Sequence, residues 1–270
     1  MISTVIGGTG FIGSHLVRHL KSLGRDVFVP KKGSEEVLSR PLGQVFYCAG
    51  LTADFRWRPF ETIDAHVSYL ARILSVGAFD SLLYLSSTRI YAGLRSASED
   101  EEIRVRPNAP DDLYNISKVA GEALCLAQAN PRVRIARLSN VVGLDLESSN
   151  FLMAVIREAV RGRIELQSSP ESSKDYIAIE DVVSLLTLIA DNGEHRVYNV
   201  ASGKSIRHAE ILERLQQLTG CDIVQAKSAP GMDFPDISVS RLKGEFPFEA
   251  QSILDYIPLI IDASRQAARE

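Results

Sequence analysis

Tyr114 and Lys118 are the residues whose types and spacing most directly suggest chemistry in this chain. They stand four apart in the run Tyr114-Asn115-Ile116-Ser117-Lys118, so on a helix the phenol and the ammonium project from one face. A free tyrosine ionises near pH ~10, which is too high for proton exchange at neutral pH. A neighbouring lysine stabilises the phenolate and lowers its pKa, which makes the pair a candidate general acid–base. The spacing alone is equally typical of an amphipathic helix surface.

A cluster of hydroxyls, Ser86-Ser87-Thr88, follows an apolar run that starts at Leu82. If that run is a buried strand, Ser87 and Thr88 lie at its carboxyl end, the edge where ligands bind in parallel sheets. There they could hydrogen-bond a substrate carbonyl or alcohol beside the tyrosine. A serine-rich turn without function is the alternative for any one of these hydroxyls.

A glycine-rich run separates an apolar strand expected over residues 2–6 from a helix expected over residues 11–23. Glycines at such a turn let the backbone approach a pyrophosphate, and the helix N-terminus adds unpaired N–H groups and a partial positive charge. Glycine turns also occur for structural reasons, but the position at the first strand-to-helix turn favours dinucleotide binding. The expected cofactor contacts are Gly7, Gly10, Phe11, Ile12 and Gly13.

Short apolar runs alternate with helical patterns through the first half of the chain. Strands are expected over residues 27–29, 45–48, 82–86 and 133–138, and one helix face is formed by Ile63, Val67, Leu70 and Leu74. The alternation predicts an α/β fold, a Rossmann-type doubly wound parallel sheet with helices on both faces. Residues 33–44 are too few for a full helix–strand–helix passage, so one strand usual in larger proteins of this architecture is expected to be missing.

A small C-terminal substrate lobe is expected to interleave with this sheet. Helical patterns cover residues 151–160, 181–190 and 209–218, with irregular sequence between them. The expected division is a dinucleotide-binding domain over residues 1–165, with strand and helix returns near 175–200, and a substrate lobe over residues 166–270. The acidic stretch 93–112 is expected to be a solvated loop.

The composition is that of an ordinary soluble globular protein, with 270 residues, 45% hydrophobic and 24% charged, and a net charge of −4. This charge predicts no nucleic-acid partner and no membrane-binding face, and no apolar run reaches the ~20 residues that span a bilayer. Cys48, Cys125 and Cys221 are too far apart for a disulfide framework or a zinc site, so no metal is expected. A strand from residue 2 leaves no room for a signal peptide, and we expect a cytoplasmic protein.

Taken in order, these motifs resemble the extended short-chain dehydrogenase/reductases, the NAD-dependent epimerase/dehydratase group that modifies nucleotide sugars. The resemblance runs from residue 2 to about residue 220, and its order and spacing are specific although no single motif is decisive. Besides the glycine run Gly7-Gly8-Thr9-Gly10-Phe11-Ile12-Gly13, it rests on Leu85-Ser86-Ser87 leading to Tyr91, Tyr114 with Lys118, Arg137-Leu138-Ser139-Asn140-Val141-Val142-Gly143, Lys174-Asp175-Tyr176-Ile177, Glu180-Asp181-Val182 and Tyr198-Asn199-Val200.

The resemblance implies that Tyr114 is the general acid–base and that Lys118 holds the nicotinamide ribose while lowering the tyrosine pKa. Ser87 matches the hydroxyl that orients the substrate oxygen, and Asn140 matches an asparagine near the diphosphate of the sugar nucleotide. Lys174 stands where similar proteins often carry a phosphate-binding arginine. A lysine keeps the charge but loses the bidentate fork.

Three departures from the family pattern narrow the expected function. Lys31 stands where relatives carry the acid that accepts the ribose hydroxyls of NAD, and Lys31 and Lys32 together would attract the 2′-phosphate of NADP. NADP is therefore the expected cofactor, with NAD as the alternative. Thr88 and Arg89 replace the acidic residues of the 4,6-dehydratases, so dehydration is not expected, and Arg89 either contacts an anionic group of the substrate or pairs with the acidic loop. His66 replaces a frequent asparagine, and a structural role is expected for it.

The sequence as a whole predicts an NAD(P)-dependent oxidoreductase that reduces a keto group of a nucleotide-linked sugar. A nucleotide-sugar epimerase with retained NAD, a reductase of a non-nucleotide ketone and a non-catalytic NAD(P)-binding regulator are the alternatives. Residues 229–232 lack the arginine that often binds the diphosphate, and Arg241 is a candidate substitute. The resemblance also implies a homodimer, formed through the helix of residues 63–74 and the helix that follows Tyr114.

Overall fold

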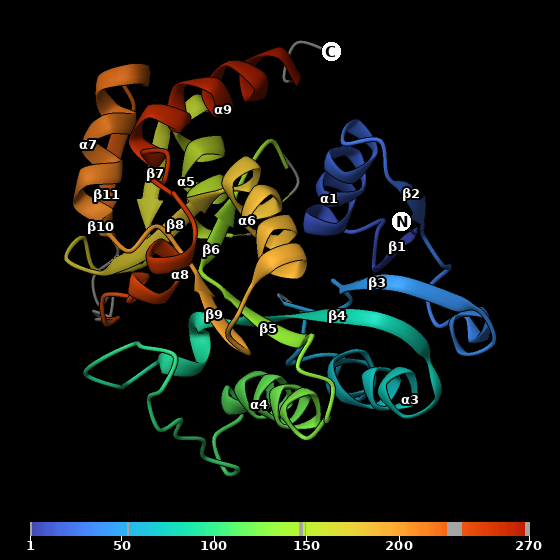
Figure 1. Ribbon diagram of the computed structural model, residues 1–270. Helices are drawn as coiled ribbons and strands as arrows, with labels where there is room; N and C mark the ends of the chain where they lie inside the picture. The colour runs from blue at the N-terminus through green and yellow to red at the C-terminus, as the bar shows by residue number, and fades with distance from the viewer. Residues whose placement is uncertain (1, 53, 146–147, 149, 226–233, 268–270) are drawn as a thin grey trace.

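The computed structural model describes residues 2–52, 54–145, 148, 150–225 and 234–267. Its centre is a six-stranded parallel sheet in the order β2-β1-β3-β4-β5-β9 (Figure 1). The strands are β1 (Ile2–Ile6), β2 (Asp26–Phe28), β3 (Pro41–Tyr47), β4 (Ala78–Ser87), β5 (Val133–Leu138) and β9 (Val197–Val200). The expected α/β fold with a parallel central sheet is confirmed.

Two of these strands are longer than the apolar runs that predicted them. β3 begins at residue 41 rather than 45, and β4 begins at residue 78 rather than 82. The added segments contain the buried polar residues Gln44 and Ser81, which stand opposite each other in the β3–β4 ladder. Backbone pairing therefore extends the strands beyond the continuous apolar runs, and Leu42 in the added part of β3 is buried in the core.

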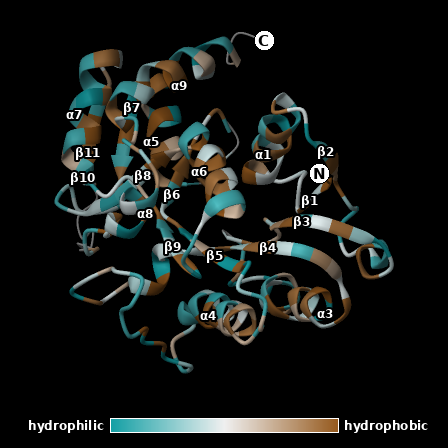
Figure 2. Cartoon of the chain, viewed as in Figure 1, coloured by the Kyte–Doolittle hydropathy of each residue, from teal (hydrophilic) through white to brown (hydrophobic). Residues whose placement is uncertain are grey.

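Helices cover both faces of the sheet (Figure 1). On one face lie α1 (Phe11–Ser22) and α6 (Ile179–Asn192), whose buried residues share an apolar core with the sheet. On the other face lie α2 (Pro59–Ile63), the π-helical turn η2 (Asp64–Ser68), α3 (Tyr69–Val76) and α4 (Asp112–Leu126). Figure 2 shows hydrophobic and hydrophilic residues together on α1, α4 and α6, as expected for helices with one side against a sheet.

The π-helical turn changes which side of its helix meets the sheet. Such a turn adds a residue to the helical repeat, so a regular stripe cannot stay buried across it. Leu70 and Leu74 are buried as expected, but Ile63 and Val67 are only half-buried, and His66 is fully buried in their place. The expected apolar face is therefore correct in its C-terminal half and wrong in its N-terminal half.

The passage between β2 and β3 contains only the short 3₁₀ helix η1 (Glu35–Leu38). Among the described residues β2 is an edge of the central sheet, and no strand lies outside it. The expectation from the shortness of residues 33–44 is confirmed.

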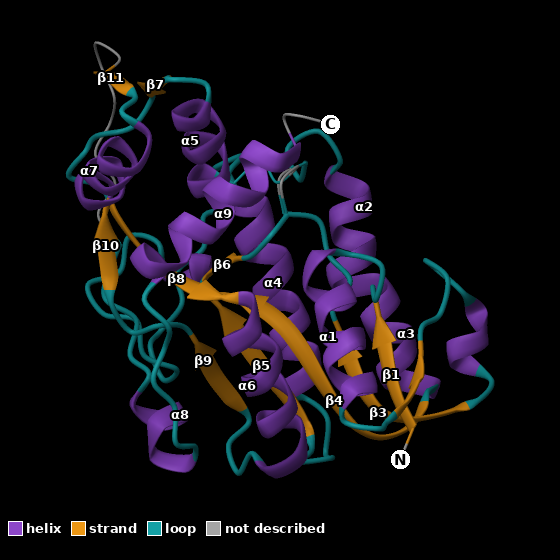
Figure 3. Ribbon diagram, turned by 90° about the horizontal axis from the view of Figure 1, so that it is seen from above, coloured by secondary structure: helices purple, strands orange, loops and turns teal. Residues whose placement is uncertain are grey.

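A second apolar core lies beside the sheet and is built by the later part of the chain. It contains α5 (Phe151–Val160), α7 (His208–Thr219) and α9 (Ile253–Ala267), with the short sheets β10 (Ser205–Arg207)-β8 (Ser173–Ala178)-β6 (Asn140–Val142) and β11 (Asp222–Gln225)-β7 (Arg163–Leu166). Figure 3 shows α5, α7, β7, β10 and β11 on one side of the molecule and β1 and β3 on the other. α5 packs in this core although it precedes residue 165, and the small helix α8 (Ser240–Glu245) returns to the core of the central sheet.

The stretch between the 3₁₀ helix η3 (Thr88–Tyr91) and α4 is not simply a solvated loop. Glu99 is buried, and its carboxylate accepts a hydrogen bond from the backbone N–H of Asn199 at 2.9 Å. Ala97 forms a bridge with Ile237 from the C-terminal part of the chain. The expectation of a fully solvated segment is wrong, because hydrogen bonds with residues distant in sequence hold Ala97 and Glu99 against the rest of the fold.

The cysteines are free thiols, with Cys125 and Cys221 buried and Cys48 partly so. In the part of the chain that the structure describes, no group of three or more His, Cys, Asp and Glu side chains could hold a metal ion. None of the described helices is long and apolar enough to cross a membrane.

Candidate active site

The glycine turn between β1 and α1 is tight on one side and open on the other. Gly7 has a φ of 80°, and a Cβ there would lie 2.8 Å from the backbone N of Ala49. A Cβ on Gly13 would lie 2.2 Å from the Gly7 carbonyl oxygen. At Gly10, by contrast, the nearest atom to an added Cβ would be that same oxygen at 3.4 Å. The space in front of Gly10 is the kind of cradle that lets a pyrophosphate approach the backbone.

Helix α1 presents uncapped N–H groups beside this space. Its N-cap, Gly10, makes no side-chain hydrogen bond, and its first turn contains no acidic residue. The N–H groups of Phe11, Ile12 and Gly13 donate to no backbone carbonyl among the described residues, as is usual for the first turn of a helix. These donors and the positive end of the helix dipole fit an anionic group. The residues present therefore fit the pyrophosphate of a nicotinamide dinucleotide, and these cofactor contacts remain a prediction.

Lys31 and Lys32 stand shortly after β2, which ends at Phe28, and both are exposed. Val29, the residue after this strand, touches the glycine turn, because a Cβ on Gly8 would lie 2.8 Å from Cγ1 of Val29. Neither lysine forms an ion pair with another described residue. Two free ammonium groups thus stand close to where the adenosine ribose would follow the pyrophosphate.

Tyr114 lies in the first turn of α4 and is only 3% exposed. Its hydroxyl is hydrogen-bonded to Ser87, the last residue of β4. Burial raises the pKa of Tyr114, whereas the Ser87 hydrogen bond and the charge of Arg89 act in the opposite direction. The phenol is therefore protonated at neutral pH and can donate its proton.

Lys118 lies one turn further along α4 and is buried. Its Nζ donates to the carbonyl of Leu85 at 2.8 Å and lies 5.9 Å from the centre of the Tyr114 ring. Burial lowers the pKa of Lys118 to about 7, although Glu122 opposes the shift. In this structure the cation that lowers the Tyr114 pKa is Arg89, not Lys118 as the sequence suggested.

The loop after β3 connects the glycine turn to the tyrosine–lysine pair. A Cβ on Gly50 would lie 3.5 Å from Nζ of Lys118, and the preceding Ala49 backbone touches Gly7. β1, β3 and β4 are neighbouring parallel strands, so their carboxyl ends meet at one edge of the sheet. The fold therefore brings the predicted cofactor turn and the predicted proton donor to the same edge.

His66 is a site residue whose position the sequence did not assign. It is fully buried in the π-helical turn, and its Nδ1 lies 2.8 Å from the Ser117 hydroxyl while its Nε2 accepts from the N–H of Leu51 at 3.2 Å. Its ring meets the Tyr114 ring edge-on, with centres 5.5 Å apart. Burial, followed by the charge of Lys118, lowers the pKa of His66 to about 2, so the imidazole is neutral. The one indication of this position in the sequence is that His66 directly precedes Val67, a member of the helix face predicted to be buried.

Arg89 also belongs to this site. Its guanidinium lies 5.0 Å from the centre of the Phe55 ring and 5.4 Å from that of Tyr114. The sequence left open whether this side chain pairs with the acidic loop, and among the described residues it forms no ion pair. A positive charge next to the proton donor would have been hard to foresee, because Phe55, Arg89 and Tyr114 meet only in the folded chain.

Besides Ser87, the other three predicted substrate residues lie in different surroundings. Thr88 is buried, and its hydroxyl donates to the Leu138 carbonyl at 3.2 Å, so it is not free toward a ligand. Asn140 is exposed at the start of β6, and its amide donates to the Asp175 carbonyl at 2.8 Å. Lys174 stands on the adjoining strand β8 with its Nζ 5.7 Å from the centre of the Phe151 ring. The structure thus brings Asn140 and Lys174 onto adjacent strands, and their contact with a substrate remains a prediction.

Arg241, the candidate substitute for a diphosphate-binding arginine, is already bound. It donates to Asp100 at 2.7 Å and to the Val197 carbonyl at 3.0 Å. This arrangement argues against a diphosphate contact. Residues 229–232 lie outside the described residues.

A buried ion pair anchors α4 to the sheet. Arg137 on β5 donates to Glu122 at 2.7 Å, and both side chains are almost fully buried. The same guanidinium donates to the Tyr91 hydroxyl at 2.7 Å, and Tyr91 in turn donates to Asn199 at 2.8 Å. This network fixes the helix that carries Tyr114 relative to β5 and β9.

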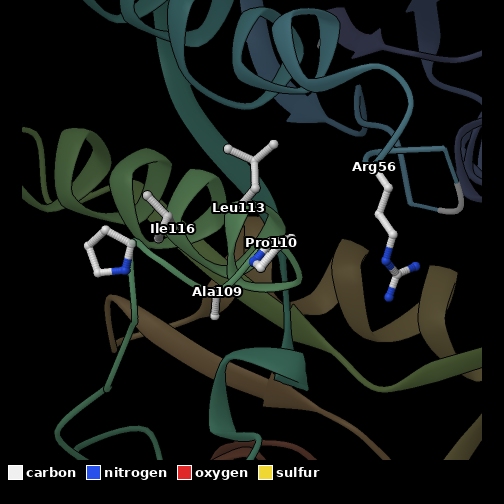
Figure 4. A pocket seen from close by; sticks show the side chains of 6 residues that line it. Arg56, Ala109, Pro110, Leu113 and Ile116 are labelled. Carbon is white, nitrogen blue, oxygen red and sulfur yellow. The ribbon is translucent and has the colours of Figure 1, made fainter.

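A hollow of about 280 Å³ lies at the start of α4. Figure 4 shows its walls, which are Arg56, Pro107, Ala109, Pro110, Leu113 and Ile116. Leu113 and Ile116 flank Tyr114 in sequence but project from other sides of the helix. The hollow is therefore separate from the proton donor.

Comparison with known proteins extends this picture. The family model described as "NAD dependent epimerase/dehydratase family" matches residues 3–201. The dTDP-4-dehydro-6-deoxy-D-allose reductase of Streptomyces bikiniensis is 22% identical over 262 residues, covering 80% of each protein. The UDP-glucuronic acid decarboxylase 1 of Xenopus tropicalis is 23% identical over 280 residues, covering 88% of this chain and 66% of that protein.

Solved structures share the fold along nearly the whole chain. MoeE5 in complex with UDP-glucose and NAD superposes with a TM-score of 0.82 at 24% identity, covering 99% of this chain and 100% of that one. RMD from Pseudomonas aeruginosa complexed with NADPH superposes with a TM-score of 0.78 at 23% identity, covering 98% of this chain and 99% of that one. The family match spans most of this sequence and includes the glycine turn, Ser87, Tyr114 and Lys118, and on this ground the chain belongs to the NAD-dependent epimerase/dehydratase family.

Proposed function

We propose that this chain is an NADPH-dependent oxidoreductase that reduces a keto group of a nucleotide-linked sugar. The observation that carries the proposal is a protonated Tyr114 phenol, hydrogen-bonded to Ser87, at the sheet edge that also bears the glycine turn. A phenol whose pKa is raised suits proton donation, the step that a reduction needs. The reductase from Streptomyces bikiniensis, whose name specifies a keto sugar nucleotide, supports this substrate class.

The chain's own residues account for the proton transfer. Bound NADPH would supply a hydride to the carbonyl carbon. Ser87 and Tyr114 would hold the carbonyl oxygen between their hydroxyls, and Tyr114 would donate its proton as negative charge develops there. Lys118, one turn away, would bind the nicotinamide ribose, and the guanidinium of Arg89 would stabilise the phenolate that remains.

NADP rather than NAD is the proposed cofactor because of Lys31 and Lys32. Neighbouring structures contain NAD in one case and NADPH in another, so the choice rests on this chain's residues. Two unpaired ammonium groups after β2 would attract a 2′-phosphate. Fluorescence titration should show tighter binding of NADPH than of NADH, and the reverse order would overturn this assignment.

The nucleotide end of the substrate is assigned to β6 and β8. Asn140 and Lys174 stand on adjacent strands of the second lobe, and the Lys174 ammonium has no ion-pair partner among the described residues. An unneutralised cation of this kind suits a diphosphate. Thr88 is the weakest of the predicted contacts, since its hydroxyl is held by Leu138.

A homodimer and a cytoplasmic location complete the proposal. Trp57, just before α2, and Phe60, within it, expose 86% and 85% of their surfaces, and large exposed apolar residues favour an interface. The dimer would use the helical segment of residues 63–74, which continues α2, together with α4. Light scattering coupled to size exclusion should give twice the mass of the 270-residue chain, and a monomer would contradict the assembly.

One set of measurements tests the function. The cofactor released from denatured protein is identified first, and NADPH oxidation is then followed with a panel of keto sugar nucleotides. Tyr114→Phe should lower kcat about 10²–10⁴-fold, whereas Tyr256→Phe, a tyrosine of α9, should not. Turnover without added NADPH by protein that retains NAD would identify an epimerase. Unchanged biological activity of Tyr114→Phe would identify a non-catalytic regulator.

A further inference from the structure

Arg89 lies against two aromatic rings of the site. Its guanidinium lies 5.0 Å from the centre of Phe55 and 5.4 Å from that of Tyr114, and the side chain is half-buried. A guanidinium that packs against rings in this way keeps its N–H donors available to a ligand. The positive charge is therefore placed beside the ring of the predicted proton donor.

The N–H donors of this guanidinium have no acceptor among the described residues. The acids that stand nearest in the acidic loop are used elsewhere: Asp111 pairs with Arg56 at 2.5 Å, and Asp112 accepts from the N–H of Arg106 at 2.8 Å. The alternative left open by the sequence, an ion pair between Arg89 and this loop, is therefore absent from the described structure. The guanidinium of this half-buried cation is therefore available to an anionic ligand that enters the site.

A second unneutralised cation lies close by. Lys174 has no ion-pair partner among the described residues, and burial, followed by the charge of Arg89, lowers the pKa of Lys174. Like charges placed together in a partly buried site repel each other unless an anion binds between or beside them. The two cations approach the site from different elements, Arg89 from η3 next to Tyr114 and Lys174 from β8 in the second lobe.

We propose that Arg89 binds a carboxylate carried by the sugar itself, so that the substrate is a nucleotide-linked uronic acid. This inference rests on the proposed function. The name of the Streptomyces relative places the keto group at C4 of the sugar, and we take the same position here. A diphosphate is attached at C1, across the ring from an oxygen at C4, whereas a uronic carboxylate is attached at C5, next to it. An anion-binding group in contact with the proton donor therefore fits the carboxylate, and Lys174 is left for the diphosphate. The planar fork of arginine matches a carboxylate with two parallel hydrogen bonds.

The test is calorimetric titration of the enzyme saturated with NADP⁺. The ligands are UDP-glucuronic acid, UDP-glucose and UDP, of which the first two differ only in a carboxylate or a hydroxymethyl group at C5. The unchanged enzyme should bind the uronate at least about tenfold more tightly than UDP-glucose. Arg89→Gln should weaken binding of UDP-glucuronic acid about ten- to hundredfold. It should leave the affinity for UDP-glucose within about twofold of that of the unchanged enzyme.

Two further variants make the result specific. Arg56→Gln removes an arginine that also lies over Phe55, at 4.7 Å, but is exposed and paired with Asp111, and it should leave both affinities unchanged. Arg89→Lys keeps the charge without the fork and should recover only part of the uronate affinity. A thermal melt of each variant confirms that the fold is retained.

The outcomes separate this inference from the function on which it rests. Equal binding of both sugars by the unchanged enzyme, or an equal loss of both in Arg89→Gln, overturns the carboxylate assignment and leaves a nucleotide-sugar enzyme intact. An equal loss would place Arg89 on the diphosphate. Failure of all three ligands to bind overturns the nucleotide-sugar function and the inference together.

Discussion

The cofactor cradle can be tested by adding one methyl group at either of two glycines. Gly10→Ala and Gly13→Ala make the same chemical change three residues apart, but the structure predicts opposite consequences. At Gly13 the methyl would lie 2.2 Å from the Gly7 carbonyl oxygen and 2.8 Å from the Cα of Gly8, both of them backbone atoms. At Gly10 the closest atom would be 3.4 Å away. The first substitution should therefore act on the fold and the second on the ligand.

The magnitudes follow from these contacts. Overpacking against backbone costs about 1–3 kcal/mol, and each kcal/mol lowers Tm by about 2–4 °C in a chain of this size. Gly10 has φ −76° and ψ 174°, which alanine adopts without strain. Alanine is a poorer N-cap than glycine, which lowers the free energy of unfolding by up to about 1 kcal/mol. About 0.4–1 kcal/mol of this is regained, because alanine restricts the unfolded chain more than glycine does. The stability of Gly10→Ala should thus be almost unchanged.

The assay combines a thermal melt without cofactor and a fluorescence titration with NADPH. Gly13→Ala should melt several degrees lower than the unchanged protein. Gly10→Ala should melt within about 2 °C of it and bind NADPH at least about tenfold more weakly, a loss of about 1.4 kcal/mol. Unchanged NADPH affinity in a folded Gly10→Ala protein would refute the assignment of the pyrophosphate to this turn.

Three other substitutions test the cofactor preference, the buried imidazole and the buried ion pair. Lys31→Asp should weaken NADPH binding about tenfold or more and NADH binding less. Parallel titrations with the two nucleotides would show this difference, and Lys21→Asp at the end of α1 is the control. The pKa of His66 is about 2 in the folded protein against about 6.5 when unfolded, so its contribution to stability is complete above pH 6.5 and falls as the pH drops below it. The loss of stability approaches about 1.4 kcal/mol per pH unit. Urea unfolding at pH 7 and pH 5 should therefore show a smaller stability difference between the unchanged protein and His66→Asn at the lower pH. A difference that stays constant would contradict a neutral buried imidazole. Glu122→Gln leaves a buried arginine unpaired and should cost about 3–5 kcal/mol in urea unfolding, whereas Glu249→Gln, from an exposed ion pair, should cost less than about 1 kcal/mol.

Much of the fold was readable from local patterns. The strand from Ile2 to Ile6, the helix that starts at Phe11 and the strand from Val133 to Leu138 lie where the sequence placed them. Each depends on residues next to one another in the chain, since a strand or helix periodicity and a glycine turn are properties of a short segment. The pairing of Tyr114 with Lys118 on one helix face is local in the same sense.

Other elements could not be read in this way. Residues 41–44 and 78–81 carry weak apolar signals, and they become strand because each supplies the other's backbone hydrogen bonds. The middle of the acidic stretch is held by Asn199, a hundred positions along the chain from Glu99. A π-helical turn displaced the predicted buried stripe by one position and put His66 inside. In each case the deciding contact comes from a segment distant in sequence.

The features of the candidate active site also separate into those that local sequence predicts and those that depend on the packing of distant segments. The order of the glycine turn, Ser87, Tyr114 and Lys118 in the chain is enough to predict a proton donor beside a nicotinamide cofactor, because turn, strand end and helix face are set locally. The electrostatics of that predicted donor come from the assembled fold, which places Arg89 against Phe55 and Tyr114 and turns Lys118 toward Leu85. Burial and the distance between charges determine a pKa, and both arise only when remote segments pack together.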